Sequence, residues 1–250
     1  MKVIVTGSEG FIGKHLCKRL KKEGHTILGL DRNSGQEALY FEVGDAEFVI
    51  HLAAWADVRA SINDPKGYWE NNVVTTTIIQ KACAENNIPL LYASSSCVHD
   101  WHRSPYGMSK KVNEETAREN QCGLRFTTVF GEGARDTMLI GRLVNNTAKY
   151  ATNHIRDFIH VDDVVDVMLL LMNKEPSEWD PAYDVGTGQG YEISYLANQV
   201  CEYDLPVQQG DECEAQHNTA NISRLNVAGW PGAKVDVVTY LKENTNKMHI

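Results

Sequence analysis

The sequence predicts an α/β fold built on a doubly wound parallel sheet. Short apolar runs typical of buried strands alternate along the chain with segments whose apolar residues recur at helical spacing, and this alternation favours a parallel sheet. A chain of 250 residues, 42% of them hydrophobic, can bury a core of that size. We expect strands near residues 2–6, 26–30, 47–53, 89–94, 124–129 and 182–186. We expect helices near residues 10–23, 66–86, 106–121, 136–148, 161–173, 193–203 and 234–243.

A glycine-rich turn follows the first predicted strand. Gly7, Gly10 and Gly13 separate the apolar run at 2–6 from an amphipathic helical pattern. Glycine tolerates the dihedral angles of a tight strand-to-helix turn and lets the backbone approach a phosphate, while the N–H groups at the helix start attract that anion. The turn therefore predicts a Rossmann-type dinucleotide site, although its Gly-x-x-Gly-x-x-Gly spacing differs from the commoner Gly-x-Gly-x-x-Gly.

The second predicted strand, 26–30, ends at Asp31. A carboxylate at this place accepts hydrogen bonds from an adenosine ribose and repels a 2′-phosphate. Asp31 alone would read as an ordinary turn residue, but its position after the second strand favours the cofactor role. We expect NAD rather than NADP.

A Tyr-x-x-x-Lys pair, Tyr106 and Lys110, lies on a predicted helix and shares one face of it. The cation favours the phenolate, which would lower the pKa of Tyr106 and make it a general base. By itself such a pair is as typical of a solvated helix face. However, the serines at 94–96 directly follow a predicted strand, and ligands of open α/β sheets bind beyond the carboxyl ends of strands.

The composition disfavours several classes of protein. A formal net charge of −9 and an isoelectric point near 5.5 disfavour partners such as nucleic acid or an anionic membrane. The six cysteines form no Cys-x-x-Cys motif, so we expect reduced thiols in the cytoplasm rather than disulfides or a zinc site. The first residues read as a strand and not as a signal peptide, and the apolar stretch 164–172 is too short to cross a bilayer. We also expect no metal at His99, Asp100 and His102, because no further ligand is spaced to join them.

Nine segments of the chain carry a resemblance to a known family. The chain is identified as a member of the extended short-chain dehydrogenases/reductases, in the NAD-dependent nucleotide-sugar epimerase/dehydratase family. It is similar to UDP-glucose and UDP-glucuronate 4-epimerases, although it is unusually short. The segments, in family order, are 6–13, 51–54, 58–61, 71–73, 94–98, 104–110, 156–164, 184–188 and 228–231.

The resemblance implies roles for individual residues. Tyr106 would be the catalytic base, Lys110 its partner at the nicotinamide ribose, and Ser95 the hydrogen-bond donor to a substrate oxygen, with Ser96 as its competitor. The NAD groove would be formed by Gly7, Gly10, Phe11, Ile12 and Gly13 at the pyrophosphate, by Asp31 and Arg32 at the adenosine, and by Leu52, Ala53, Ala54 and Asn71 along its wall.

Three further residues would contact a nucleotide-diphosphate sugar. Arg156 matches the arginine of the family that pairs with the substrate diphosphate, and its alternative role is to tie down Asp157. Arg59, in a Val-Arg-x-Ser segment typical of hexuronate 4-epimerases, would meet a uronic acid or else lie on a surface loop. Thr128 stands where an asparagine normally contacts the substrate phosphate.

The family also implies a division of the chain and an assembly. Residues 1–130 and 156–186 would form the NAD-binding domain, and residues 131–155 and 187–250 a small lobe that binds the substrate. Helices at 66–86 and 106–121 would pair with those of a second copy, so we expect a homodimer.

The residues beside the predicted serine favour one reaction of this family. Its dehydratases and decarboxylases resemble Thr-Asp-Glu or Thr-Ser-Glu here, because those reactions need another acid or base. The run Ser95-Ser96-Cys97 has no carboxylate. We therefore predict an epimerase that inverts C4 of a UDP-hexose or UDP-hexuronate through a transient 4-keto intermediate. The alternatives are a dehydratase, decarboxylase or reductase of the same family, or a catalytically silent NAD-binding sensor or scaffold.

The chain departs from the family pattern at three places. Only 19 residues separate Asp31 from His51, so the usual third strand and its helix must be abbreviated. Val98-His99-Asp100 replaces the common Val-Tyr-Gly, and Gln208 and Gln209 stand where a second phosphate-binding arginine is typical. These departures affect the adenine end and the contacts with the substrate.

Overall fold

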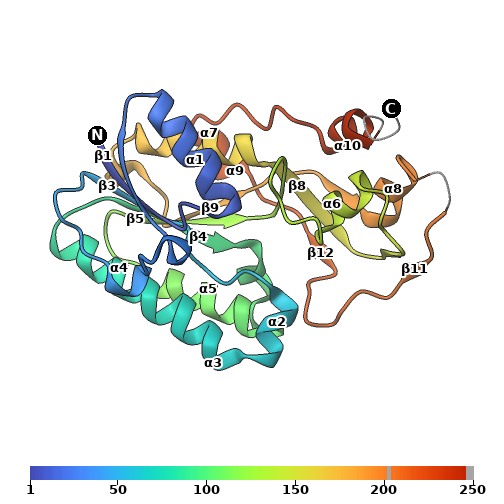
Figure 1. Cartoon of the computed structure of the whole chain (residues 1–250), viewed down its shortest axis with the longest axis horizontal. Helices are drawn as coiled ribbons and strands as arrows, with labels where there is room; N and C mark the ends of the chain where they lie inside the picture. Colours follow the sequence, from blue (N-terminus) through green and yellow to red (C-terminus); the bar gives the residue numbers. More distant parts are fainter. Residues whose placement is uncertain (202–203, 246–250) are drawn as a thin grey trace.

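A computed structural model describes residues 1–201 and 204–245 (Figure 1). Its main sheet has six strands in the order β2-β1-β3-β4-β5-β9, and every neighbouring pair is parallel. The strands are β1 (Lys2–Thr6), β2 (Thr26–Leu30), β3 (Phe48–His51), β4 (Leu90–Ser95), β5 (Gln121–Phe126) and β9 (Ala182–Val185). Because the strand order reverses between β1 and β3, the sheet has a topological switch point there, and the doubly wound α/β prediction is confirmed.

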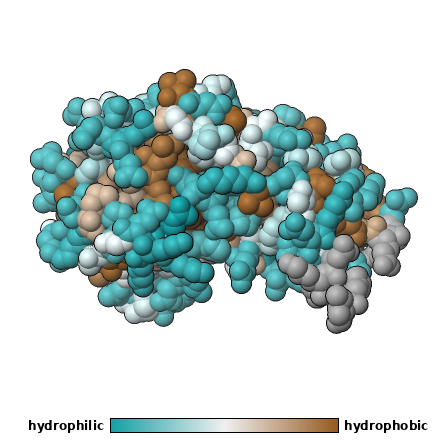
Figure 2. All heavy atoms as spheres, turned by 90° about the horizontal axis from the view of Figure 1, so that it is seen from above, coloured by the Kyte–Doolittle hydropathy of each residue, from teal (hydrophilic) through white to brown (hydrophobic). Residues whose placement is uncertain are grey.

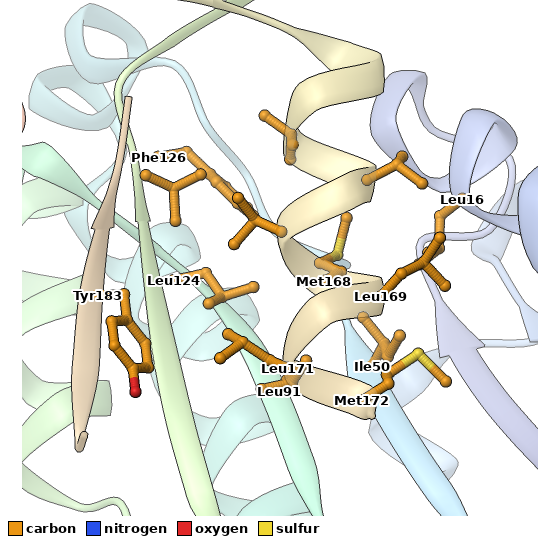
Figure 3. Packing of buried hydrophobic residues seen from close by; sticks show 14 of the residues in the cluster. Leu16, Ile50, Leu91, Leu124, Phe126, Met168, Leu169, Leu171, Met172 and Tyr183 are labelled. Atoms are coloured by element: carbon orange, nitrogen blue, oxygen red, sulfur yellow. The ribbon is translucent and has the colours of Figure 1, made fainter. Parts of the chain in front are cut away.

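Helices cover both faces of this sheet. The alternation of side chains along β1 sends Val3 and Val5 into one core and Ile4 into another. The first core packs against α1 (Phe11–Lys22) and α7 (Val161–Met172), as Figure 3 shows for the α7 side chains between Leu16 and the strands. The second core includes side chains from α4 (Thr75–Glu85), which is followed along the chain by α5 (Pro105–Glu115).

A smaller unit, built from the second half of the chain, lies beside the main sheet (Figure 1). Its elements are β6 (Thr128–Phe130), α6 (Leu139–Val144), β7 (Ala151–Thr152), β8 (Ile155–His160), β10 (Gly190–Glu192), α8 (Ile193–Asn198), β11 (Val207–Gln208), β12 (His217–Asn218) and α10 (Val237–Thr245). A separate core that includes Phe130, Leu143, Phe158, Leu196 and Leu241 holds it together. Leu225, on α9 (Ser223–Val227), and Trp230 pack instead into the main core, so the chain recrosses between the two units. The exact domain limits stay a prediction.

Several predicted elements differ from the structure. The helix expected over 106–121 ends at Glu115, because Asn120 adopts a left-handed φ of 61° and Gln121 pairs with Leu90 in the sheet. The strand expected over 124–129 is two strands, β5 and β6. The helix expected over 66–86 is divided into α3 (Pro65–Tyr68), a π-helical turn (Trp69–Val74) and α4. The helix expected to reach residue 203 ends at Asn198, and residues 202–203 lie outside the described part of the chain.

The region between β2 and β3 is as short as the sequence indicated. It contains only two 3-10 turns, Arg32–Ser34 and Ala38–Tyr40, in the place of a further strand and helix. The remaining short elements are α2 (Val58–Asn63) and the 3-10 segments Ser96–Arg103 and Pro176–Glu178. The face seen in Figure 2 is mostly hydrophilic, with hydrophobic residues in small patches. Within residues 1–201 and 204–245, no helix has the length and apolar character needed to span a membrane.

Candidate active site

The glycine turn lies where β1, α1 and the end of β3 meet. Gly7 has a φ of +69°, and a Cβ added to it would lie 2.7 Å from the Ala53 nitrogen. A Cβ on Gly13 would overlap the Gly7 carbonyl oxygen. These two glycines are therefore required by the packing of the protein's own backbone. The N-cap of α1 is Gly10, and no side chain caps this end of the helix, so the N–H groups of its first turn have no side-chain acceptor.

Asp31 lies beside this turn at the end of β2. Its carboxylate is buried and accepts backbone hydrogen bonds of 3.0 Å from Glu9 and from Asn33. Arg32 extends over the Trp55 ring, with its guanidinium carbon 5.9 Å from the ring centroid. The two residues expected at the adenosine end thus stand next to the glycine turn, and Trp55 joins them.

The segment after β3, with Asn71, is the part of the chain predicted to line one side of the NAD groove. Leu52, Ala53 and Ala54 continue from the strand without helical structure, and the Ala53 N–H donates to the Thr6 hydroxyl at 3.2 Å. Asn71 donates to Asn72 at 2.9 Å. The fully buried member of that pair is Asn72, which bonds both the N–H and the carbonyl of Trp55 and so holds this wall in place.

Tyr106, Lys110 and Ser95 come together at the carboxyl end of β4. All three are buried. The Lys110 ammonium lies 5.9 Å from the Tyr106 ring centroid and donates to the Ala93 carbonyl at 2.8 Å. The Tyr106 hydroxyl lies within hydrogen-bonding reach of the Ser95 side chain. The Tyr-Lys pair of α5 and the serine of β4 thus form one cluster, as the sequence predicted.

The electrostatics of this cluster differ from the prediction. Burial raises the pKa of Tyr106 above its ordinary value, and hydrogen bonding to Ser95 only partly opposes this. The expectation that Lys110 brings the pKa of Tyr106 down is therefore wrong. Burial also lowers the pKa of Lys110 to about 8. Its ammonium, turned to the Ala93 carbonyl, stays largely charged at neutral pH.

Ser95 and Ser96 are distinguished by their partners. The amide of Asn218, on β12, donates to the Ser96 hydroxyl at 2.7 Å. The Ser95 oxygen accepts a longer bond of 3.2 Å from the Cys97 N–H and also lies within hydrogen-bonding reach of Tyr106. Ser95 therefore belongs to the cluster with Tyr106, whereas Ser96 is part of the contact between the sheet and the lobe.

The two arginines expected to contact a substrate converge on one carboxylate. Arg156, on β8, bonds Glu214 at 3.0 Å and donates to the Ala215 carbonyl at 2.7 Å. Arg59 bonds the other oxygen of Glu214 at 2.9 Å. The alternative role of Arg156 is wrong, because Asp157 accepts instead from backbone N–H groups and from the Thr187 hydroxyl. The alternative for Arg59 is wrong as well, since this residue lies on helix α2 rather than on a loop and is half-exposed in an ion pair. The substrate roles of both arginines stay predictions. Thr128 is partly buried at the start of β6 and lies in register with Phe158 of β8.

The comparison with protein families decides the identity of this arrangement. The model of the NAD dependent epimerase/dehydratase family matches residues 3–186. The chain belongs to this family. That range contains the glycine turn, Asp31 and the cluster of Ser95, Tyr106 and Lys110, so the predicted resemblance is confirmed.

Individual members of the family are similar over most of the chain. Protein CapI from Staphylococcus aureus is 32% identical over 253 residues, which cover 76% of this chain and 75% of that protein. A probable UDP-glucuronate 4-epimerase from Rhizobium meliloti (strain 1021) is 28% identical over 238 residues, with 71% of this chain and 70% of that protein covered. A solved structure of MoeE5 in complex with UDP-glucose and NAD is 25% identical, covers 100% of this chain and 99% of its own, and has a TM-score of 0.84.

The cofactor of the family is NAD, and the residues of this chain fit it. The uncapped start of α1 supplies N–H groups and the positive end of a helix dipole, which suit a pyrophosphate. Asp31 stands beside it, and its carboxylate would suit ribose hydroxyls, while Lys110 and Tyr106 lie further along the carboxyl edge of the sheet. The predicted cofactor is therefore confirmed, while the role of each residue remains a prediction.

Two residues of the site were not predicted from the sequence. Burial raises the pKa of both Tyr68 and Tyr106, and Arg135, an exposed residue between β6 and α6, lies close enough for its charge to oppose this rise in part. Cys97 lies close enough to Tyr106 for a negative charge on its thiol to raise the pKa of the tyrosine. Arg135 has no motif of its own, whereas the position of Cys97 directly after the two serines could have indicated it. Among the described residues, no group of three or more His, Cys, Asp or Glu side chains is placed to hold a metal.

Proposed function

We propose that this protein is an epimerase that inverts C4 of a nucleotide-diphosphate hexose or hexuronate. The observation that carries the proposal is the buried cluster of Tyr106, Lys110 and Ser95, with no carboxylate in the run 95–97. Similar proteins include UDP-glucuronate and UDP-glucose 4-epimerases, at 28% and 25% identity. A 4-epimerase needs a base, a hydroxyl to orient the sugar and a hydride acceptor, and it needs no further acid.

Each residue of the cluster has a task in this reaction. Ser95 orients the C4 oxygen, and Tyr106 takes the proton from the C4 hydroxyl and later returns it. Bound NAD supplies the hydride acceptor and, after the keto sugar has turned over, the hydride donor. Because burial raises the pKa of Tyr106, the phenolate form depends on nearby positive charge, and the charge of Arg135 acts in that direction. Lys110, with a pKa of about 8, is positively charged at neutral pH and would hold the nicotinamide ribose, as the resemblance to the family implies.

The diphosphate would bind near Arg156, in the role that the sequence suggested. Glu214 now holds this guanidinium at 3.0 Å, so a diphosphate must share or replace the carboxylate. A substrate with a uronic acid would bring a second anion into the site. Arg135 is the better placed residue for it, since Arg59 is engaged by Glu214 and Asp211.

The proposal extends to the state of the protein in the cell. All six cysteines are unpaired, which suits a reducing compartment, and we infer a cytoplasmic protein. Exposed apolar side chains on the segments expected at the dimer interface, among them Trp69, Val74 and Met108, support a homodimer.

The test is a panel of UDP-, GDP- and dTDP-sugars incubated with the purified protein and NAD, with the products resolved by NMR. A C4 epimer without net change in NAD supports the proposal. Tyr106→Phe should lose about 100-fold to 10,000-fold in turnover, as expected for a positioned general base, and should keep NAD binding. Tyr195→Phe, at an exposed tyrosine of the lobe, is the matched control and should turn over normally.

One observation favours a second candidate, a dehydratase of the same family. The Cys97 thiol stands beside Tyr106 and offers a second group for proton transfer, at a carbon next to the transient ketone. A 4-keto-6-deoxy product that disappears in Cys97→Ser would establish this candidate and overturn the first. An epimerase with Cys97→Ser activity near that of the natural chain would rule it out.

A further inference from the structure

A network of hydrogen-bonded and charged side chains lies next to the catalytic cluster, on strands β4, β5 and β9 and on helix α5. Ser94 donates to Glu114 at 2.6 Å, and Arg125 holds both oxygens of Glu114 at 2.9 and 2.7 Å. The same guanidinium lies 3.5 Å from Asp184, which bonds His99 at 2.9 Å. The carboxylate side chains of Glu114 and Asp184 are each only 9% exposed. This network of side chains thus links β4, α5, β5, β9 and the 3-10 segment Ser96–Arg103.

That 3-10 segment is the covalent connection between two catalytic residues. Its eight residues join Ser95, the last residue of β4, to the start of α5, where Tyr106 is the second residue. Two of its contacts lead to the lobe: Ser96 accepts from Asn218 at 2.7 Å, and Arg103 donates to the Glu212 carbonyl at 3.2 Å. Near its start the segment is also bonded to Ser95 of β4, through the Cys97 N–H. At its centre, His99 forms a side-chain hydrogen bond to Asp184 of β9.

We propose that His99, through Asp184, is a positioning residue for the Ser95 and Tyr106 pair. The segment also packs against α5 and β5, and its Val98 is buried. Without the bond to Asp184, the centre of the segment would lose its tie to β9, and motion of the lobe, passed on through Asn218 and Glu212, would change the spacing of the two catalytic side chains more readily. With this bond, the segment is tied to β9 and β5, and the rigid sheet fixes the distance between the Ser95 and Tyr106 side chains. The proposal rests on the proposed epimerase reaction only for its kinetic test.

The charges around His99 make the stabilisation by the His99–Asp184 bond depend on pH. Asp184 of β9, Arg125 of β5 and Glu114 of α5 face its ring. The hydrogen bond to Asp184 raises the pKa of His99, against the effects of burial and of Arg125. For Asp184, burial raises the pKa, but the bond and charge of His99, the Asn221 N–H and the charge of Arg125 together lower it. A raised His pKa means that this stabilisation is complete below the ordinary pKa of 6.5 and is lost as the pH rises through the higher value of the folded protein.

The test compares His99→Phe, which removes the bond, with His99→Gln, which keeps a donor without the charge. Lys111→Met, at the exposed Lys111–Glu115 pair of α5, is the control. Misplacement of reacting groups by about 1 Å can cost on the order of 100-fold, so we expect kcat of His99→Phe to fall by about 10-fold to 100-fold with little change in KM. His99→Gln should recover part of this loss, and its pH profile should lack the component that titrates with His99.

Hydrogen exchange of peptides that cover residues 96–103 provides a readout that needs no turnover. We expect faster exchange there in His99→Phe and in Asp184→Asn, and natural rates in Lys111→Met. Unchanged exchange would overturn the proposal, even if kcat fell, because the effect would then come from contact with the substrate. Normal kcat with faster exchange would overturn it too. If the natural chain turned over no sugar, the epimerase proposal would fail and the exchange data would still decide this one.

Discussion

Replacement of Gly13 by alanine tests why the strand-to-helix turn needs glycine. The added Cβ would lie 2.9 Å from both the Gly7 carbonyl carbon and the Ser8 Cα, and closer still to the Gly7 oxygen. Carbon atoms in contact prefer about 3.5–4.0 Å, so the start of α1 must retreat from the turn by at least about 0.6 Å. All of the neighbours in question are backbone atoms, and they cannot turn aside as a side chain would.

Two effects of opposite sign determine the result. Alanine is a better helix former than glycine by about 1 kcal/mol. Overpacking of a tight interior costs about 1–3 kcal/mol, and occasionally more. Because all of the clashing neighbours are backbone atoms, we place the cost in the upper part of this range, at about 2–3 kcal/mol, so that the free energy of unfolding falls by about 1–2 kcal/mol. For a chain of this size each kcal/mol corresponds to about 2–4 °C in Tm, so the expected loss is about 2–8 °C.

Thermal unfolding and calorimetric titration with NAD measure the two consequences. Because the pyrophosphate would sit at this helix start, NAD affinity should fall together with Tm. Lys14→Ala, at the next and exposed position of α1, is the control and should change neither quantity appreciably. A Gly13→Ala protein that is as stable as the natural chain and binds NAD equally well would refute the packing argument.

Four further predictions concern the cofactor, the assembly and the charges of the site. NAD should bind more tightly than NADP, and Asp31→Ala should narrow the difference; equal binding of both by the natural chain would contradict the role of Asp31. Light scattering at micromolar concentration should find a dimer, and Trp69→Glu should weaken it, whereas a monomeric natural chain would disprove the interface. Burial lowers the pKa of Lys110 to about 8, so its positive charge reduces the stability of the folded protein below pH 8, and this loss disappears as the pH rises to the ordinary pKa of 10.5. Lys110→Met should therefore raise Tm at pH 7, raise it less at pH 10, and abolish turnover. A lower Tm at pH 7 would contradict this effect of burial on stability. Arg135→Ala should lower kcat/KM with both substrates, because the charge of Arg135 favours the Tyr106 phenolate. The loss should be about 10-fold or more larger with UDP-glucuronate than with UDP-glucose, since a hydrogen-bonded ion pair typically contributes about 1.5–3 kcal/mol; equal losses would exclude a carboxylate-specific role.

The features that depend on near neighbours in the chain could be predicted from the sequence. The glycine turn follows from residues within one strand-to-helix connection, and the shared face of Tyr106 and Lys110 follows from their spacing on a single helix. The parallel sheet and the abbreviated region after Asp31 could also be read from the order and length of the apolar runs. In each case a local pattern is enough because the geometry of one strand or one helix imposes it.

Tertiary structure decided the partners and the charges of the site. Arg156 and Glu214 are 58 positions apart, His99 and Asp184 are 85 apart, and Asn218 is 122 from Ser96, so no local spacing indicates these pairs. The pKa of Tyr106 is the sharpest case. Its sequence neighbour Lys110 suggests a lowered value, yet burial by surrounding elements raises it. The cost of desolvating a charge depends on how completely the whole fold encloses the group, and a sequence motif contains no measure of that enclosure.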